Sequence, residues 1–254
     1  YKMLMAFLAM KDTGMETHSF PSYGAFICGN QVQLDVKRDN YIRIINAFNK
    51  IEAAKAYLFS NSEFSGAAWD TKISRDIFWE KSLHGYFEEN VGIYPKDYQS
   101  EGEFFNNLVK TAIFTATREG KSYYFKPIRV KDYLEQKEIT AYTADGHEKN
   151  IKPVKDDLKQ HRSYQFQDLT ARGTVELRSV CTQSLETTFA PIAFELGLFV
   201  QLEKLENYLK SCAFFEKEKP DYRELRKKYS KKFLSNEEKE IIQSFSKDLI
   251  DIAR

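Results

Sequence analysis

Two charged residues lie inside a segment that otherwise has the pattern of a buried strand, and this feature constrains the fold more than any other. The segment 172–183 reads Arg-Gly-Thr-Val-Glu-Leu-Arg-Ser-Val-Cys-Thr-Gln. Because successive side chains of a strand point to opposite faces, Glu176 and Arg178 share one face while Leu177 and Cys181 lie on the other. A carboxylate and a guanidinium are costly to bury unless they pair or meet a bound ion. The strand therefore predicts either a structural ion pair or the floor of a site that binds metal and phosphate.

Composition sets the class of protein. The chain has 254 residues, of which 42% are hydrophobic and 30% charged, which suits one large soluble domain or two small ones. The net charge of +1 implies no broad basic surface, so we expect no nucleic-acid partner. The three cysteines, Cys28, Cys181 and Cys212, are odd in number and widely spaced, which favours a reducing compartment over a disulfide framework. Their spacing is also not that of a zinc site. Since no signal peptide and no apolar run of about 18 residues are found, we expect a cytoplasmic protein without a membrane partner.

Both ends of the sequence fall inside helical patterns. The chain opens at Tyr1 within an apolar helical stretch that has no initiator Met and no capping residue. It closes at Arg254, again within a helical pattern. We therefore interpret the sequence as a piece of a longer polypeptide.

Hydrophobic periodicity and turn residues predict both helices and strands. Strands are expected over 25–36 and 172–183, and a hairpin over 116–124 is expected to turn at Glu119-Gly120. The polar stretch 137–157 is expected to be a surface loop or an insertion. Helices are expected over residues 1–11, 41–60, 75–91, 101–117, 130–136 and 190–212, followed by a Lys/Glu-rich, solvated helical pair over 216–240.

Two further groups of polar residues have a chemical and a structural interpretation. Gln31, Gln33 and Asp35 share one face of the first strand, where they could bind a hard cation and a zwitterionic substrate. They could equally form the hydrated face of a half-exposed strand. Arg75 follows a loop of small polar residues, 61–66, at the start of a predicted helix, an arrangement that suits carboxylate recognition. An arginine at a helix start is also common in surface helices.

Taken together, these segments resemble the glutamate–cysteine ligase family, in its plant and bacterial carboxylate–amine ligase branch. Residues 26–35, Phe-Ile-Cys-Gly-Asn-Gln-Val-Gln-Leu-Asp, are similar to the family's Thr-x-x-Gln-Val-Asn-Leu-Asp strand. Residues 57–64, Tyr-Leu-Phe-Ser-Asn-Ser-Glu-Phe, resemble its Leu-Phe-Ala-Asn-Ser-Pro-Phe loop. Residues 74–79 resemble its Arg-Ser-x-Ile-Trp element, and residues 174–183 its Val-Glu-x-Arg strand. The resemblance extends from the first residues to about residue 210.

The resemblance implies an α+β, glutamine-synthetase-like fold, with a curved antiparallel sheet and helices packed outside it. This catalytic portion would cover residues 1–212, and the Lys/Glu-rich helices of 213–254 would pack on it. The implied activity joins the γ-carboxylate of glutamate to the amine of cysteine through a γ-glutamyl phosphate, the first step of glutathione synthesis. ATP and Mg²⁺ are the implied cofactors, and glutamate and cysteine the implied substrates.

The resemblance also implies roles for individual residues. Glu176 and Gln31 would be metal ligands, and Arg178 would hold the ATP phosphates during catalysis. Gln33 and Arg75 would contact the substrate glutamate, with Arg75 on its α-carboxylate.

Departures from the family pattern leave other functions open. The family has Asn at the position of Gln33 and Pro at that of Glu63. Its Gly-x-Glu-x-Glu strand and a second acidic segment would lie upstream of Tyr1, so the chain by itself is expected to be inactive unless the missing N-terminal part of the same protein, or a companion chain, supplies those carboxylates. The alternatives are a related ligase with another acid or amine, and a non-catalytic interaction module.

Overall fold

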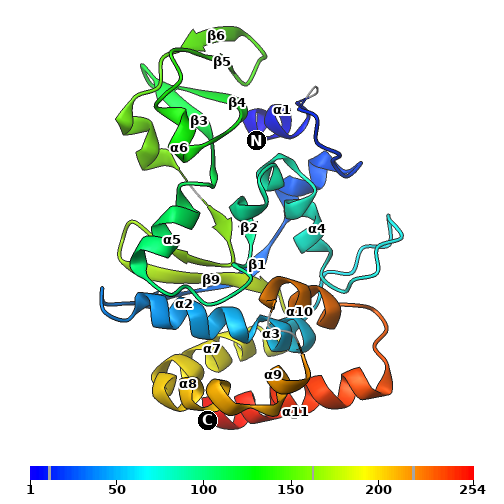
Figure 1. Ribbon diagram of the computed structural model, residues 1–254. Coiled ribbons are helices and arrows are strands. Elements are labelled where there is room, and N and C mark those ends of the chain that lie inside the picture. Colours follow the sequence, from blue (N-terminus) through cyan, green and yellow to red (C-terminus); the bar gives the residue numbers. More distant parts are fainter. Residues whose placement is uncertain (11–12, 162, 219–220) are drawn as a thin grey trace. The chain divides into compact units, whose positions relative to one another are not determined.

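The computed structural model describes residues 1–10, 13–161, 163–218 and 221–254 (Figure 1). It is a mixed α+β structure with open antiparallel sheets, as the α+β expectation requires. The chain forms two compact units. Unit 1 comprises residues 1–27, 76–92 and 102–165, and unit 2 comprises residues 28–75, 93–101 and 166–254. Both predicted portions, 1–212 and 213–254, therefore contribute to unit 2.

Unit 1 contains a four-stranded antiparallel sheet in the order β3-β4-β5-β6. Its hairpin turn at Glu119-Gly120 has positive φ at both residues, 52° and 75°, as a two-residue hairpin with right-handed strand twist requires. The predicted hairpin is thus confirmed. The strands are β3 (Ala112–Arg118), β4 (Lys121–Arg129), β5 (Ile139–Tyr142) and β6 (Glu148–Ile151).

The prediction of a surface loop over 137–157 is wrong. This stretch forms β5, β6 and the 3₁₀ helix η4 (Lys155–Gln160). Its few apolar side chains, Ile139, Ala141 and Ile151, are buried in the core of the sheet. The polar composition of the whole stretch therefore hid a short alternating pattern that is enough to anchor two strands.

Two predicted helices of unit 1 are shorter than expected. The helix expected over 101–117 ends at Leu108, because the Ala-Ile-Phe-Thr-Ala-Thr run that follows pairs as β3. The helix expected over 75–91 ends at Glu80 and is followed by 3₁₀ turns. The end of the first helix was predicted at Lys11, which lies outside the described residues. The smaller elements of unit 1, of which α4 and α5 begin in unit 2, are α1 (Lys2–Leu8), η1 (Pro21–Phe26), α4 (Ser74–Glu80), η2 (Leu83–Gly85), η3 (Glu88–Asn90), β2 (Val91–Gly92), α5 (Glu101–Leu108), α6 (Val130–Tyr133) and β7 (Tyr164–Gln165).

Unit 2 is built on a three-stranded antiparallel sheet in the order β1-β9-β8. The predicted strand over 172–183 is confirmed as the central strand β9, whereas the strand predicted over 25–36 is shorter, since Pro21–Phe26 form η1. Helices α2, α3 and α7 contact the sheet, and the other helices pack behind them (Figure 1). The elements are β1 (Gly29–Asp35), α2 (Tyr41–Lys50), α3 (Glu52–Phe59), β8 (Gln167–Leu169), β9 (Thr174–Cys181), η5 (Leu185–Thr187), α7 (Ala190–Val200), α8 (Leu202–Ser211), α9 (Ala213–Lys217), α10 (Tyr222–Tyr229) and α11 (Asn236–Ala253).

The two longest predicted helices of unit 2 are each broken at a single residue. Ile51, with φ −90° and ψ 3°, separates α2 from α3, and Gln201, with φ −98° and ψ 29°, separates α7 from α8. The first break leaves both α2 and α3 in contact with the sheet, whereas the second turns α8 away from it and against α2. Within the described residues no single helix is long and apolar enough to cross a membrane; the segments 185–200 and 202–217 reach that criterion only together, across a bend of 86°.

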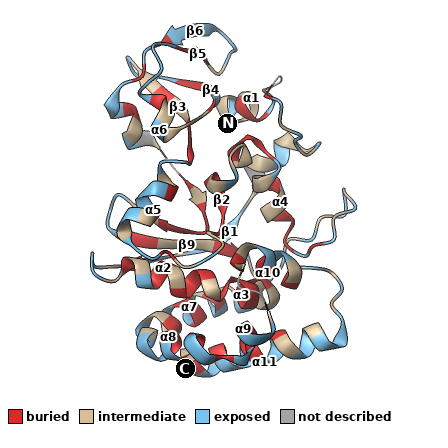
Figure 2. Ribbon diagram, viewed as in Figure 1, coloured by how far each residue is buried: buried red, intermediate tan, exposed pale blue. Residues whose placement is uncertain are grey.

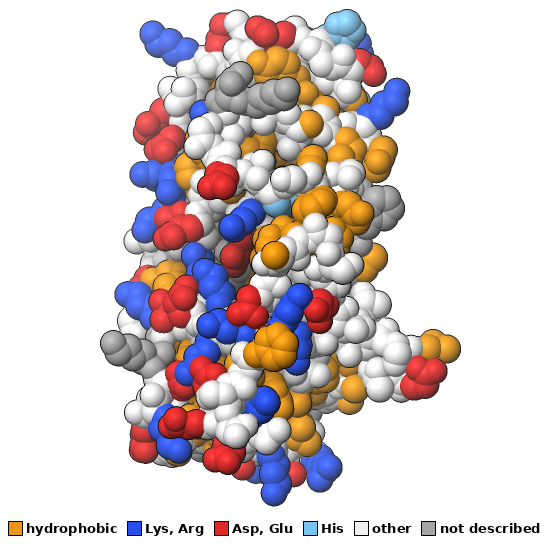
Figure 3. All heavy atoms as spheres, turned by 90° about the vertical axis from the view of Figure 1, so that its right-hand side faces the viewer, with side chains coloured by type: hydrophobic (Ala, Val, Ile, Leu, Met, Phe, Trp, Pro, Cys, Tyr) orange, Lys and Arg blue, Asp and Glu red, His pale blue; other side chains and the backbone are white. Residues whose placement is uncertain are grey.

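The core of unit 2 lies between β9 and the helices that cover it. Val175 and Leu177 of β9 are fully buried, as are Ile44 and Phe48 of α2 (Figure 2). Outside the core, side chains of opposite charge lie next to one another on the face shown in Figure 3, in keeping with the net charge of +1.

Candidate functional site

The candidate site is the polar face of the β1-β9-β8 sheet. Gln33 of β1 lies directly opposite Glu176 of β9, and Asp168 of β8 lies opposite Glu176 from the other side. Residues directly opposite one another in antiparallel strands point to the same face. Gln33, Glu176 and Asp168 therefore form a row across the sheet, with Arg178 two residues further along the central strand. Gln31 lies where the pairing of β1 with β9 is irregular, between Asn30 and Val32.

Arg178 joins the two carboxylates of this row. Its Nη2 atom donates hydrogen bonds to Oε2 of Glu176, at 2.8 Å, and to Oδ2 of Asp168, at 3.2 Å. All three side chains are largely buried but not sealed from solvent, with 17%, 16% and 11% of the Arg178, Glu176 and Asp168 side chains exposed. The structure thus contains the ion pair that was one of the two interpretations of the strand, and it adds a second carboxylate to it.

Asp168 was missed by the sequence analysis, although the sequence holds a signal for it. Gly173 has φ +79°, a conformation that favours glycine, and it closes the turn between β8 and β9. A hairpin centred on this turn places Asp168, five positions before Gly173, close to Glu176. Reading the turn as a hairpin would have paired the Phe-Gln-Asp-Leu run with β9.

Gln33 is held by the same hairpin. Its Oε1 atom accepts hydrogen bonds from Nη2 of Arg172, at 2.7 Å, and from Oγ1 of Thr174, at 3.4 Å. Gln31 and Asp35 are exposed on the same strand, as the alternation predicted. The face therefore combines amide, carboxylate and guanidinium groups, the donor and acceptor types that bind phosphates and amino acids.

The residues of this face do not form a Mg²⁺ site by themselves. Mg²⁺ requires near-octahedral oxygen ligands, and both carboxylates of the row, Glu176 and Asp168, already bond to Arg178. Across the described residues, no group of three or more His, Cys, Asp or Glu side chains could hold a metal ion. Glu176 and Gln31 stay predicted ligands whose remaining partners would have to come from outside the described residues.

Arg75 is placed at the same sheet but as a support for its backbone. Its Nη1 atom donates to the carbonyl oxygens of Arg178, at 2.9 Å, and Val180, at 3.5 Å. Only 7% of Arg75 is exposed. Gly29 makes room for it, because a Cβ atom at this position would lie 3.0 Å from Nη2 of Arg75. The loop residue Ser62 accepts a hydrogen bond from the Arg75 backbone N–H, so the predicted loop and arginine do come together beside β9.

Replacing Arg75 with Met is expected to lower the free energy of unfolding by about 2 to 4 kcal/mol. The substitution removes a buried charged donor from two carbonyl oxygens, and hydrogen bonds from charged groups are worth about 1.5 to 3 kcal/mol each. Urea unfolding followed by circular dichroism measures the change. Arg43→Met is the matched control, since the Arg43 side chain is 50% exposed and its pairing with Glu206 should be worth less than about 1 kcal/mol. Equally small decreases in the free energy of unfolding of both variants would contradict the supporting role of Arg75.

The opposite face of β9 carries a buried cluster of charges that the sequence analysis did not foresee. Lys55 Nζ lies 2.8 Å from Oε1 of Glu52 and 2.7 Å from Oε1 of Glu195. Arg226 Nη1 lies 2.6 Å from Oε2 of Glu52 and its Nη2 donates to the carbonyl oxygen of Ser179. All four charged side chains are at most 4% exposed. Helices α3, α7 and α10 are thereby tied to one another and to the central strand.

Burial and pairing act against each other in this cluster. Burial opposes ionisation of Glu52, but Lys55 and Arg226 outweigh it and lower the pKa of this carboxyl below its ordinary value. Burial opposes the charge of Lys55 as well, yet Glu195 and Glu52 raise its pKa. For Glu195, burial prevails over its single cationic neighbour, Lys55, and raises its pKa. Lys55 is therefore the cation that the two carboxylates share, while Arg226 supports Glu52 as well.

Comparison with known proteins assigns no family to this chain. The sequence matches no protein-family model, and no curated protein matches it.

Proposed function

We propose that this chain is the catalytic portion of an ATP-dependent carboxylate–amine ligase with a glutamine-synthetase-like sheet. More specifically, the protein would be a cytoplasmic glutamate–cysteine ligase that acts through a γ-glutamyl phosphate. The observation that carries it is the row of Gln33, Glu176 and Asp168 across one sheet face, with Arg178 beside it. The segments that resemble the ligase family, which are far apart in the sequence, supply three of these four residues.

The proposed roles follow from the chemistry of each side chain. Arg178 would bind the phosphates of ATP by exchanging one of its carboxylate partners for phosphate oxygens, which guanidinium binds in the same two-pronged way. Glu176 and Gln31 would each supply a ligand for Mg²⁺, and acidic strands outside this sequence would complete the site. Gln33 and Arg75 would contact glutamate. Arg75 would then share its five donors between the β9 carbonyls and the substrate α-carboxylate.

A non-catalytic interaction module is the second candidate. The pairing of Arg178 with two carboxylates favours it, because a neutralised guanidinium attracts phosphate less strongly. The incomplete set of metal ligands among the described residues favours it too.

The deciding experiment measures ADP release by the full-length gene product with glutamate, Mg-ATP and cysteine, against a panel of other amines. Cysteine-dependent turnover is the result expected from the proposal. Turnover with a different amine or acid would keep the reaction class and correct the substrate. Folded full-length protein that neither binds ATP nor releases ADP would overturn the ligase assignment in favour of the interaction module.

A further inference from the structure

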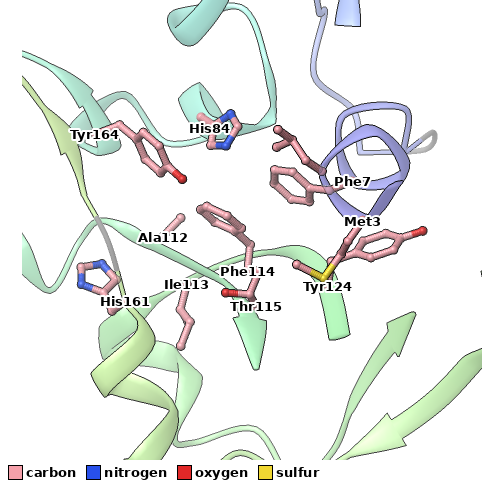
Figure 4. A pocket seen from close by; sticks show the side chains of 11 residues that line it. Met3, Phe7, His84, Ala112, Ile113, Phe114, Thr115, Tyr124, His161 and Tyr164 are labelled. Carbon is pink, nitrogen blue, oxygen red and sulfur yellow. The ribbon is translucent and has the colours of Figure 1, made fainter. Parts of the chain in front are cut away.

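Unit 1 contains a cavity of about 190 Å³ whose walls are largely aromatic (Figure 4). It opens between α1, η2, β3, β4 and β7. None of the predicted ligase residues lines it, so a ligand of this cavity is independent of the proposed function. Its lining residues are Met3, Leu4, Phe7, His84, Ala112, Ile113, Phe114, Thr115, Tyr124, His161 and Tyr164.

The rings around the cavity are fixed by contacts with one another. The ring of His84 lies 4.5 Å from that of Tyr164, and 5.4 Å from those of Phe7 and Phe114 (centroid to centroid). Phe7 and Phe114 stack with an interplanar angle of 17°. These rings come from α1, η2, β3 and β7, so the cavity is held open by four elements rather than by one loop. A wall of this kind presents both ring faces and ring edges to a ligand.

The cavity is poor in charge. Among the described residues that line it, none carries a carboxylate, an amine or a guanidinium. Burial lowers the pKa of His84 to about 3, so this ring is neutral at physiological pH. The Nε2 atom of His161 lies 2.8 Å from Oγ1 of Thr111. A charged ligand would therefore lose its hydration without gaining a salt bridge to a carboxylate, lysine or arginine of the described lining.

One side chain gives the apolar cavity a polar point. Figure 4 shows the hydroxyl group of Tyr164 directed toward Phe114 and the interior of the cavity. In size the cavity exceeds the roughly 150 Å³ apolar cavity that is known to hold benzene. It thus has room for one substituted six-membered ring, with a hydroxyl group within its walls to meet a polar substituent.

We propose that this cavity binds a small, neutral, planar aromatic molecule that carries one hydrogen-bonding group. Planarity is favoured by the stacked and edge-on rings of the wall, neutrality by the lack of a carboxylate, amine or guanidinium in the described lining, and the polar substituent by the Tyr164 hydroxyl. The occupant is a single ring of the phenol type.

Matched probes test the chemical class by calorimetric titration of the purified chain. p-Cresol and 4-methylcyclohexanol have the same heavy-atom skeleton and the same hydroxyl, but only p-cresol is planar and aromatic. We expect p-cresol to bind about tenfold more tightly, as the added ring–ring contacts predict. Tetramethylammonium should not bind. Equal affinity for the two alcohols, tighter binding of the cation, or no binding of p-cresol would each overturn the proposal.

The place of binding is tested in the unmodified protein through its methionine methyl groups. Met3 lines the cavity and Met5, on the same helix, does not. In ¹³C-methyl NMR spectra, p-cresol should shift the Met3 resonance and leave that of Met5 in place; the reverse would put the ligand elsewhere. Tyr164→Phe should weaken the binding of p-cresol about fivefold and leave the affinity for toluene unchanged, because the substitution removes one hydrogen bond and no ring. Leu4→Trp should fill the cavity and abolish binding, whereas Ala9→Trp, at an exposed position, should not.

Discussion

Replacing Lys55 with Met is expected to lower the free energy of unfolding by about 3 to 5 kcal/mol, the range found when one partner of a buried ion pair is removed. Lys55 is the cation that Glu52 and Glu195 share, at 2.8 and 2.7 Å. Methionine preserves most of the volume of the side chain, so the loss reports the charge rather than a cavity. Urea unfolding at neutral pH measures it. Because the cluster joins α3, α7 and α10 to β9, we expect the urea unfolding transition of the whole of unit 2 to become less cooperative.

Lys50→Met provides the control on the preceding helix. Lys50 pairs with Asp97 at 2.6 Å, but their side chains are 22% and 31% exposed. Solvent screens this pair, so its loss should cost less than about 1 kcal/mol. A similar loss in both variants would contradict a special role for the buried cluster.

The pH dependence of the Lys55→Met variant supplies a second test. Without the lysine, burial should raise the folded-state pKa of Glu195 further, and that of Glu52 above its present lowered value. A carboxyl whose pKa is higher in the folded state binds more protons when folded, so stability falls as the pH rises above its unfolded value, near 4.5. The variant should therefore lose more stability relative to the wild type at pH 8 than at pH 5. A constant difference between these pH values would argue against buried, unpaired carboxylates.

The sequence predicted elements well where a local pattern decides the structure. The Glu119-Gly120 turn has a glycine at one of its two positions with positive φ, and the hairpin formed as predicted. The central strand was recognised because three alternating residues of one face, Val175, Leu177 and Cys181, are apolar. Predictions failed where tertiary contacts override such patterns. The continuous periodicity across Ile51 and Gln201 does not reveal a break, since both halves of each helix bury an apolar face.

The candidate site was predicted in part, and for a definable reason. Alternation places Glu176 and Arg178 on one face, but it cannot show which strand lies beside them. Asp168 was missed because it depends on pairing between β8 and β9. Likewise, the position of Arg75 against the β9 carbonyls depends on packing between segments about 100 residues apart, which no local pattern contains.

Replacing Glu176 with Gln should reduce turnover of the full-length ligase by about 10³-fold, if the proposed function is right. Glutamine keeps the shape of the side chain but removes the negative charge that a metal ligand in phosphoryl transfer supplies, and electrostatic stabilisation of this reaction is worth several kcal/mol. Stability should change by less than about 1 kcal/mol, because the glutamine Oε1 can still accept a hydrogen bond from Arg178, and Arg178 keeps its hydrogen bond to Asp168. Initial rates of ADP release at saturating substrates measure the first effect, and urea unfolding measures the second.

Glu203→Gln is the matched control, since Glu203 is an exposed residue of α8 and the same change of charge there should leave turnover unaltered. Two results would separate the interpretations of the central strand. Loss of turnover with intact stability would assign Glu176 to the chemistry. Unaltered turnover together with a marked loss of stability would make the carboxylate a structural partner of Arg178, which is the other interpretation that the alternation of β9 allows. The charged residues of the polar face would then serve to stabilise the fold, and an active site would have to lie on another surface of the protein.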